Sequence, residues 1–353
     1  MRATRADLVV VGGGPVGLAT ALHADRAGLC TVVVEPRRQP VDKACGEGLM
    51  PSALTELAGL GVDPPGRPFR GIRYVDERAG AEAVALFRGD PGRGVRRTTL
   101  HAALSDRVAG ATVTSLAARV VAVGWDRQRA GVVTADGHRV EADFVVAADG
   151  LHSPVRRMLA LSPGRRAPSQ RPSRFGLRRH FRVEPWSPYV DVHWADGVEA
   201  YVTPVCDDVV GVALLTDQRC GWEALLQRFP LLRERLVDAE PVDRVLGAGP
   251  LRQPVSYRSR GKVLLAGDAA GYVDALTGEG LAVGLVSARL AVASLVEGSL
   301  GSYDRRWRAA TRRSRWLTEL TVSAASVPWA RQRLVVGAAR FPRLFAAAVH
   351  ALE

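Results

Sequence analysis

Three glycines and one glutamate near the N-terminus have the spacing of a dinucleotide site. Gly12, Gly14 and Gly17 stand between a short apolar run and a helical pattern, and Glu35 ends the next apolar run. In such a strand–turn–helix–strand unit, the glycines allow a tight turn, close approach of the backbone to a pyrophosphate, and close packing of helix and sheet. Free N–H groups at the helix start would face the phosphates. Glu35 would accept the hydroxyls of an adenosine ribose and repel a 2′-phosphate.

Three further segments carry residues that could meet a cofactor. In the loop Lys43-Ala44-Cys45-Gly46, glycine next to Cys45 would let the backbone pass close against a flat ring system. Arg97 lies at the start of a predicted helix whose leucines share one face. Asp149-Gly150 follows a predicted buried strand at residues 144–147.

The order strand, glycine turn, helix occurs again late in the chain. A strand is predicted at residues 262–266, and Gly267-Asp268 follows it directly. The segment Gly278-Glu279-Gly280 then leads into a long apolar helix, whose N-terminus would be directed at polar cofactor atoms. We therefore expect one dinucleotide to be held from both ends of the sequence.

The elements that must position these residues divide into an α/β part and a strand-rich part. Between residues 174 and 215 four strands follow one another without helices, which predicts a separate antiparallel sheet. Two strands at residues 71–87 are expected to join this sheet, and two short helices are expected at about 221–238. Residues 301–350 are predicted to be helical, with breaks at Pro328 and Pro342.

These elements suggest three units. We expect a cofactor-binding domain, a substrate-binding sheet and a C-terminal helical segment; the ranges are 1–70, 92–172 and 256–300 for the first, 71–91 and 173–255 for the second, and 301–353 for the third.

Composition and charge limit the partners. The 353 residues are 47% hydrophobic and carry a net charge of +12, with Lys43 and Lys262 as the only lysines. No nucleic-acid-reading module accompanies the arginines, so the first interpretation is a solvated basic face, and the alternatives are contact with an acidic carrier protein, a membrane surface or an anionic cofactor. The basic, aromatic-bearing C-terminal helices could pack on the core or contact a membrane.

The four cysteines lack metal-ligand spacing, and we expect reduced thiols and no metal site. The start of the chain leaves no room for a signal peptide, and its longest apolar run is too short to cross a bilayer. We therefore expect a cytoplasmic protein, with peripheral membrane contact as a further possibility.

Taken together, the opening fingerprint, Arg97, Asp149-Gly150 and the late glycine segments resemble the FAD-dependent para-hydroxybenzoate hydroxylase superfamily. This superfamily includes aromatic hydroxylases, flavin halogenases and geranylgeranyl reductases. The resemblance implies a Rossmann-like FAD-binding domain with an inserted antiparallel β-sheet domain and a C-terminal helical segment. The residues expected to bind FAD are Gly12, Gly14, Pro15, Val16, Gly17, Glu35, Pro36, Arg37, Lys43, Cys45, Gly46, Arg97, Val121, Asp149, Gly150, Gly267, Asp268, Gly278, Glu279, Gly280 and Leu281.

The resemblance implies an enzyme that takes hydride from NADPH or NADH and uses reduced FAD on a small hydrophobic substrate. Because oxygen insertion is common across the superfamily, the first expectation is a flavoprotein monooxygenase. The alternative is a carbon–carbon double-bond reductase of the geranylgeranyl or menaquinone reductase type, which residues 43–46 and 277–280 favour. A non-redox cyclase that contains FAD is a third possibility.

Three details bear on the choice of reaction. Hydroxylases of the superfamily commonly carry a histidine where Gly271 stands here, and the Trp-x-Trp-x-x-Pro signature of halogenases is absent, so halogenation is disfavoured. Cys45 is a candidate catalytic residue, because a thiol over the flavin could deliver a proton while hydride moves to a double bond. The alternative for Cys45 is a small buried hydrophobic residue.

Overall fold

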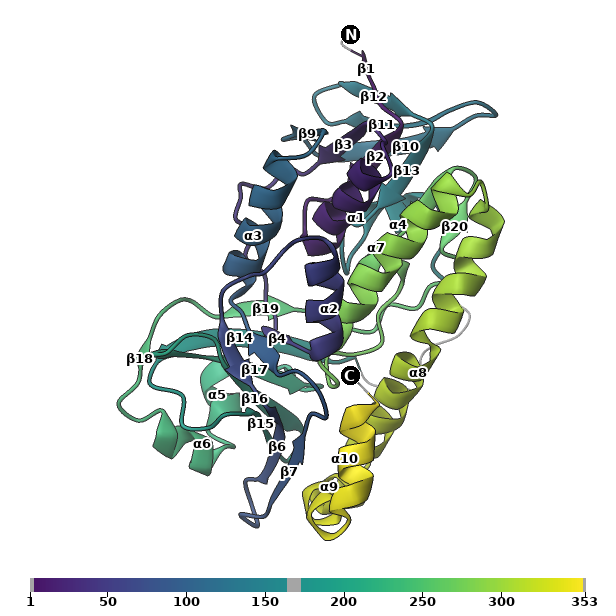
Figure 1. Ribbon diagram of the computed structural model, residues 1–353. Helices are drawn as coiled ribbons and strands as arrows, with labels where there is room; N and C mark the ends of the chain where they lie inside the picture. The colour runs from purple at the N-terminus through teal and green to yellow at the C-terminus, as the bar shows by residue number, and fades with distance from the viewer. Residues whose placement is uncertain (1–2, 164–172, 352–353) are drawn as a thin grey trace.

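A computed structural model describes residues 3–163 and 173–351 (Figure 1). Residues 1–2, 164–172 and 352–353, which form parts of the expected domains, lie outside the described residues. In Figure 1 one α/β body occupies the upper half, a strand-rich body lies below it, and a long helix, α8, runs along the side of both.

The α/β body is built on a six-stranded sheet whose central strands are apolar and buried. The strand order is β20 (Ser259–Arg260), β21 (Val263–Leu265), β13 (Phe144–Ala147), β2 (Leu8–Val11), β3 (Thr31–Val34) and β9 (Val113–Leu116). All pairs are parallel except β20 with β21. The carboxyl ends of β2, β3, β13 and β21 therefore meet at one edge, where such sheets bind ligands.

Helices cover one face of this sheet and a smaller sheet covers the other. The helices are α1 (Pro15–Arg26), α2 (Pro51–Gly59), α3 (Arg97–Ala109) and α7 (Gly280–Val296). The smaller sheet has the order β1 (Ala3–Arg5), β12 (Arg139–Ala142), β11 (Ala130–Thr134) and β10 (Val120–Trp125). Valines of the smaller sheet, among them Val132 and Val140, share one buried core with β2, β3 and β13. The short helix α4 (Pro154–Met158) follows β13.

The strand-rich body is a large sheet that receives strands from two parts of the chain. Its order is β18 (Glu240–Pro241), β14 (Phe175–Arg182), β17 (Val209–Thr216), β16 (Val198–Pro204), β15 (Val190–Ala195), β6 (Gly71–Asp76) and β7 (Glu82–Leu86), and β19 (Leu246–Ala248) also pairs with β14. The early strands β6 and β7 join it as predicted. However, β6 pairs with β15 in parallel, so the sheet is mixed rather than purely antiparallel. The reason is that a distant connection, unlike a hairpin, leaves strand direction free.

Each face of the large sheet is covered by helices. On one face, Trp222, Leu225 and Phe229 of α5 (Trp222–Leu226) and the following residues pack against valines of β16 and β17. Helix α6 (Pro230–Arg235) completes this layer. The C-terminal helices α8 (Leu300–Ser326), α9 (Pro328–Arg340) and α10 (Pro342–His350) contribute to the other, where Val322 and Phe345 contact the sheet. Both helix breaks fall at the predicted prolines.

A three-stranded sheet at the junction of the two bodies was not predicted. It consists of β4 (Gly48–Leu49), β8 (Gly92–Gly94) and β5 (Arg67–Phe69). An ideal Cβ on Gly94 would lie 1.8 Å from the carbonyl oxygen of Pro204 in β16, so this strand touches the large sheet through bare backbone. Strands of two or three residues that contain glycine have no pattern by which a sequence could reveal them.

Among the described residues, no helix combines the length and apolar character that crossing a membrane requires.

Candidate active site

The glycine turn between β2 and α1 is too tight for side chains at two of its positions. Gly12 has φ +105°, and an ideal Cβ there would lie 2.5 Å from the Ala148 carbonyl oxygen. A Cβ on Gly17 would lie 1.8 Å from the carbonyl oxygen of Gly12. An ideal Cβ on Gly14, by contrast, would meet just one atom within 4 Å among the described residues, Arg97 Nη2 at 3.7 Å. The turn therefore has an open place where the N-terminus of α1 and a guanidinium converge.

Glu35 lies at the end of β3, as predicted, but its carboxylate is already bonded. The N–H of Gly13 donates to Oε2 at 2.8 Å, and Arg37 donates through Nε, Nη2 and its backbone N–H. Burial raises the pKa of Glu35, but the hydrogen bonds from Arg37 and Gly13 outweigh it and hold the pKa below its ordinary value. These four donors fill the acceptor sites of a carboxylate. A ribose would therefore have to displace the Arg37 side chain, which is 53% exposed.

A buried histidine that the sequence analysis did not single out holds the glycine turn. His101 Nε2 lies 2.8 Å from the carbonyl oxygen of Gly13, and Ser105 Oγ lies 3.2 Å from Nδ1. Burial lowers the pKa of His101, so the neutral ring donates from Nε2 and accepts at Nδ1. In the sequence, the one feature that could have indicated this role of His101 is its position one helical turn after Arg97.

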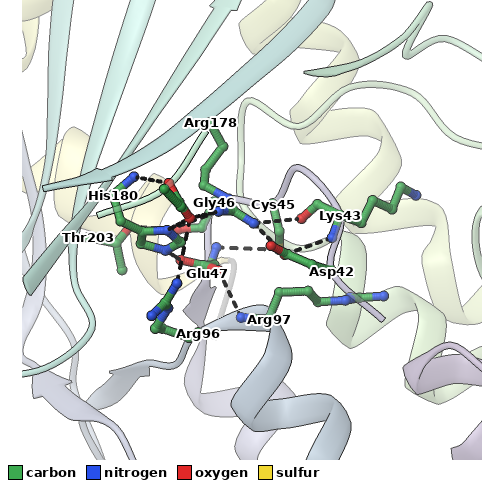
Figure 2. Close-up of polar contacts among 11 residues, drawn as sticks. Asp42, Lys43, Cys45, Gly46, Glu47, Arg96, Arg97, Arg178, His180 and Thr203 are labelled. Carbon is green, nitrogen blue, oxygen red and sulfur yellow. Dashed lines mark hydrogen bonds and ion pairs between the residues drawn. The ribbon is translucent and has the colours of Figure 1, made fainter. Parts of the chain in front are cut away.

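The backbone N–H of Arg97 is hydrogen-bonded, whereas its side chain is unpaired in the part of the chain that the structure describes. Its backbone N–H donates to Glu47 Oε1 at 2.8 Å, which satisfies one open donor at the start of α3. Figure 2 shows the side chain extending away from that contact. Among the described residues, the guanidinium has no hydrogen-bond or ion-pair partner, and its Nε is buried. An unpaired cation beside the open place at Gly14 suits an anionic ligand.

The late turn lies against the early one. Val16 in the first turn of α1 contacts the backbone of Gly267, where an ideal Cβ would lie 3.0 Å from Val16 Cγ2. Gly267 has φ +60° and begins the 3-10 turn η1 (Gly267–Ala270), and its N–H donates to Ser287 Oγ of α7 at 2.7 Å. Asp268 remains partly exposed and is paired with Lys43 at 3.3 Å. The predicted meeting of the two ends of the sequence is thus present.

Arg156 joins the Asp149-Gly150 segment to the late turn. Its buried guanidinium donates to the carbonyl oxygens of Leu151 at 2.8 Å and Ala269 at 3.1 Å. Asp149 accepts the Val155 N–H at 3.0 Å through Oδ2, while its buried Oδ1 has no partner among the described residues. Burial raises the pKa of Asp149.

A small cleft opens between the late turn and α8. Glu279 lines it, is 8% exposed and accepts a hydrogen bond from Ser314 Oγ of α8 at 2.8 Å. Burial raises the pKa of Glu279 to about 7. Gly278 has φ +71°, and a Cβ on Gly280 would lie 3.0 Å from the ring of Tyr272. Leu281 follows in the first turn of α7 and packs on the apolar core between helices.

The loop that carries Cys45 lies between the two bodies. Cys45 is half-buried, and its Sγ accepts the N–H of Glu47 at 3.4 Å. The carbonyl oxygen of Gly46 accepts from Thr203 Oγ1 of β16 at 2.7 Å. Figure 2 shows this loop beside Arg178, His180 and Thr203 of the large sheet, with the Lys43 side chain directed away from them.

Two of the remaining predicted cofactor contacts adjoin the glycine turn or Glu35, and the third, Val121, lies elsewhere. Pro15 is buried at the first position of α1, and Pro36 is exposed directly after Glu35. Val121 lies on β10, at an irregularity in its pairing with β11, and its side chain is 48% exposed. The structure thus places Val121 in the smaller sheet, apart from the turns that hold the other residues, and its contact with the cofactor stays a prediction.

Comparisons with known proteins agree with this arrangement. Residues 5–174 match the family model described as FAD binding domain. The chain is 30% identical over 334 residues to menaquinone reductase from Mycolicibacterium smegmatis, covering 86% of this chain and 80% of the relative. It is 28% identical over 320 residues to digeranylgeranylglycerophospholipid reductase 2 from Methanopyrus kandleri, covering 81% of this chain and 75% of the relative.

The fold is also that of a solved flavoenzyme. The crystal structure of p-nitrophenol 4-monooxygenase from Pseudomonas putida DLL-E4 superimposes with a TM-score of 0.81 at 18% identity. The match covers 100% of this chain and 99% of that chain. At this identity the likeness concerns the fold, and it confirms the expected combination of FAD-binding body, inserted sheet and C-terminal helices.

The residues of the site fit FAD. The open place at Gly14, the α1 N-terminus and the unpaired Arg97 guanidinium suit the pyrophosphate. The N-terminus of α7, reached through Gly278 and Gly280, suits a group on which negative charge develops. The chain is an FAD-dependent oxidoreductase and belongs to the para-hydroxybenzoate hydroxylase and geranylgeranyl reductase superfamily of flavoproteins.

Proposed function

We propose that this protein saturates a carbon–carbon double bond in an isoprenoid chain, which is the alternative that the sequence analysis left open beside monooxygenation. Two reductase relatives support this choice by their names, since menaquinone and digeranylgeranylglycerophospholipid both contain unsaturated isoprenoid chains. FAD, once reduced, supplies the hydride for such a reaction.

The observation that carries the proposal is the apolar wall beside the late turn. Val192, Trp194 and Leu215 of the large sheet form one buried cluster with Leu276 of the late turn. Tyr201 of β16 reaches the same turn, because its hydroxyl donates to the Leu276 carbonyl oxygen at 2.8 Å. The same cluster includes Val322 and Ala325 of α8, so an apolar chain would reach this wall by displacing α8 and would then leave no polar group unpaired there.

Saturation of a double bond needs a proton as well as a hydride. We infer that the thiol of Cys45 donates this proton to one carbon while the flavin hydride goes to the other, and that water then reprotonates the thiolate. The half-buried position of Cys45, between the large sheet and the FAD-binding body, supports this role. NADPH or NADH is the proposed source of the hydride that reduces FAD.

The decisive experiment separates reduction from oxygen insertion. Protein loaded with FAD is reduced with NADPH or NADH without oxygen, and a geranylgeranyl lipid or a menaquinone is then added. We expect a product two hydrogen atoms heavier and reoxidation of the flavin. A product that forms only when oxygen is admitted, and that carries an added oxygen atom, would instead establish the monooxygenase.

Cys45→Ser tests the proton donor separately. A hydroxyl is a much weaker acid than a thiol, so we expect the step that consumes substrate to slow by about tenfold to a hundredfold, within the range usual for general acids. Reduction of FAD by NADPH or NADH should be unchanged, which can be measured as the loss of yellow absorbance before substrate is added. Unchanged substrate turnover in Cys45→Ser would remove Cys45 from the mechanism.

We also propose that the C-terminal helices contact an anionic membrane surface, where an isoprenoid lipid would be found. Large apolar side chains of α8, α9, α10 and the residue that joins α9 to α10 are exposed to between 52% and 71%, namely Trp316, Leu320, Trp329, Phe341 and Leu344. Residues 312–350 carry seven arginines against one acid, Glu319. Exposed aromatic residues among arginines suit the boundary between lipid headgroups and acyl chains.

A further inference from the structure

A group of charged side chains fastens the Cys45 loop to the large sheet (Figure 2). We name it the Glu47 cluster; it consists of Asp42, Glu47, Arg178, His180 and Asp243. Asp42 and Glu47 flank Cys45 in the loop, Arg178 and His180 lie on β14, and Asp243 lies between β18 and β19. Arg178, His180 and Glu47 are each at most 3% exposed, whereas Asp42 and Asp243 lie at the edge of the cluster and are partly exposed.

His180 is the centre of the cluster. Its Nε2 lies 2.5 Å from Glu47 Oε2, and its Nδ1 lies 2.6 Å from Asp243 Oδ2. Arg178 donates to the same Asp243 oxygen at 2.7 Å and also pairs with Asp42. Every member is thus hydrogen-bonded or ion-paired to at least one other member.

Two of the three carboxylates of the cluster, those of Glu47 and Asp243, face the two nitrogens of His180. Arg178 Nη1 also lies 2.9 Å from His180 Nδ1, and Arg96 lies 3.5 Å from Asp243. The three acidic side chains thus lie beside two arginines and a histidine. Such pairing matters because a buried charge without a partner is costly.

Glu47 links this cluster to the predicted cofactor contacts. Its Oε1 accepts the backbone N–H of Arg97, its carbonyl oxygen accepts the Val95 N–H at 2.8 Å, and its own N–H donates to Cys45 Sγ. Glu47 also holds a left-handed backbone conformation, φ 60°, which is strained for a residue with a side chain. A Cβ on Gly211 would lie 3.1 Å from Glu47 Oε2, so the glycine at this position of β17 leaves room for the carboxylate.

We propose that Glu47 and His180 are positioning residues that hold the Cys45 loop between the large sheet and the start of α3. His180 of the large sheet holds Glu47, and Glu47 in turn contacts both the Cys45 thiol and the start of α3, where Arg97 lies. This inference deepens the proposed function, on which it rests for the meaning of the loop. The contacts that define it involve residues of this chain alone.

The chain contains a matched control pair. His193 Nδ1 lies 2.5 Å from Glu77 Oε1, both side chains are at most 5% exposed, and His193 belongs to the same sheet, on β15. Glu77, however, accepts from the backbone N–H groups of Leu231 and Leu232 at α6, not from the Cys45 loop. Breaking the His193–Glu77 pair also removes a histidine–carboxylate bond from the large sheet, but it leaves the contacts of the Cys45 loop in place.

The test compares Glu47→Gln and His180→Gln with His193→Gln. Each protein, without FAD, is treated with iodoacetamide, and alkylation is followed for each cysteine by peptide mass spectrometry; the exposed Cys30 and Cys220 serve as internal references. FAD affinity and thermal unfolding are measured alongside. We expect Cys45 to react about tenfold faster in the two cluster variants, the change that about 1.4 kcal/mol of lost loop stability gives.

FAD affinity should fall in the same two variants, while His193→Gln should keep wild-type alkylation and FAD affinity even where its thermal stability drops. Wild-type reactivity of Cys45 in folded Glu47→Gln and His180→Gln would overturn the proposal, and so would an equal increase in His193→Gln. Should the cluster variants fail to fold, Thr203→Val removes only the hydroxyl that donates to Gly46, and it should raise Cys45 reactivity by a smaller factor.

These readouts are independent of the substrate. If Cys45 reactivity changes as expected while no double bond is reduced by the wild type, the positioning role stands and the proposed reaction fails. If the wild type reduces a double bond and the alkylation rates of Cys45 are equal in all variants, the proposed reaction stands and the positioning role fails.

Discussion

Gly17 and Gly337 are both helical glycines, yet the space around them differs completely. A Cβ on Gly17 would overlap the Gly12 carbonyl oxygen, whereas a Cβ on Gly337 in α9 meets no atom within 4 Å. We therefore expect Gly17→Ala to lose about 1–3 kcal/mol of stability through overpacking and to bind FAD poorly. Gly337→Ala should gain about 0.5–1 kcal/mol, because alanine loses less backbone entropy in a helix. Denaturant unfolding and FAD titration measure both, and normal FAD binding by Gly17→Ala would contradict the close approach seen here.

At the scale of elements, the C-terminal helices make the membrane proposal testable. Trp329 is 64% exposed on α9, and Tyr257, which lies before β20 in the α/β body, is 65% exposed. We expect the wild type to sediment with vesicles that contain phosphatidylglycerol and less with phosphatidylcholine alone, since the helices are rich in arginine. Trp329→Ser should weaken sedimentation, whereas Tyr257→Ser should not. A wild type that stays in the supernatant with both vesicles would refute the membrane contact.

At the scale of the whole molecule, buried carboxyls make stability depend on pH. Burial raises the pKa of Glu279 and of Glu199 to about 7, from an ordinary value of 4.5. Below pH 4.5 each carboxyl is protonated in the folded and the unfolded chain. As pH rises from there to about 7, the unfolded chain releases the proton while the folded chain retains it, so stability is lost.

Glu279→Gln should remove the loss of stability with rising pH that the Glu279 carboxyl causes. Relative to wild type without FAD, the variant should gain about 3 kcal/mol between pH 4.5 and 8, at about 1.4 kcal/mol per pKa unit. Denaturant unfolding at a series of pH values measures this difference. Glu223→Gln, whose side chain is 76% exposed in the native protein, serves as the control and should show no such trend. A constant difference between Glu279→Gln and wild type would mean that Glu279 is ionised in the folded chain.

The sequence by itself determined the features that depend on short stretches of chain. The strand and turn before α1, the helix breaks at Pro328 and Pro342, and the second glycine turn at Gly267 were all predictable. Each follows from apolar periodicity, from the backbone freedom of glycine or from the missing N–H of proline, and these act over a few residues. The superfamily followed from the order of such motifs along the chain.

Only the tertiary structure decided which polar residues meet. Glu47 and His180 are 133 positions apart, and His101 and Gly13 are 88 apart. In the sequence Glu47, His101 and His180 are lone polar residues without a pattern, and nothing local distinguishes His180 from His193. The partner of a buried charge is set by which strands and helices pack together, because its desolvation must be offset by whatever group of opposite charge lies within a few ångströms.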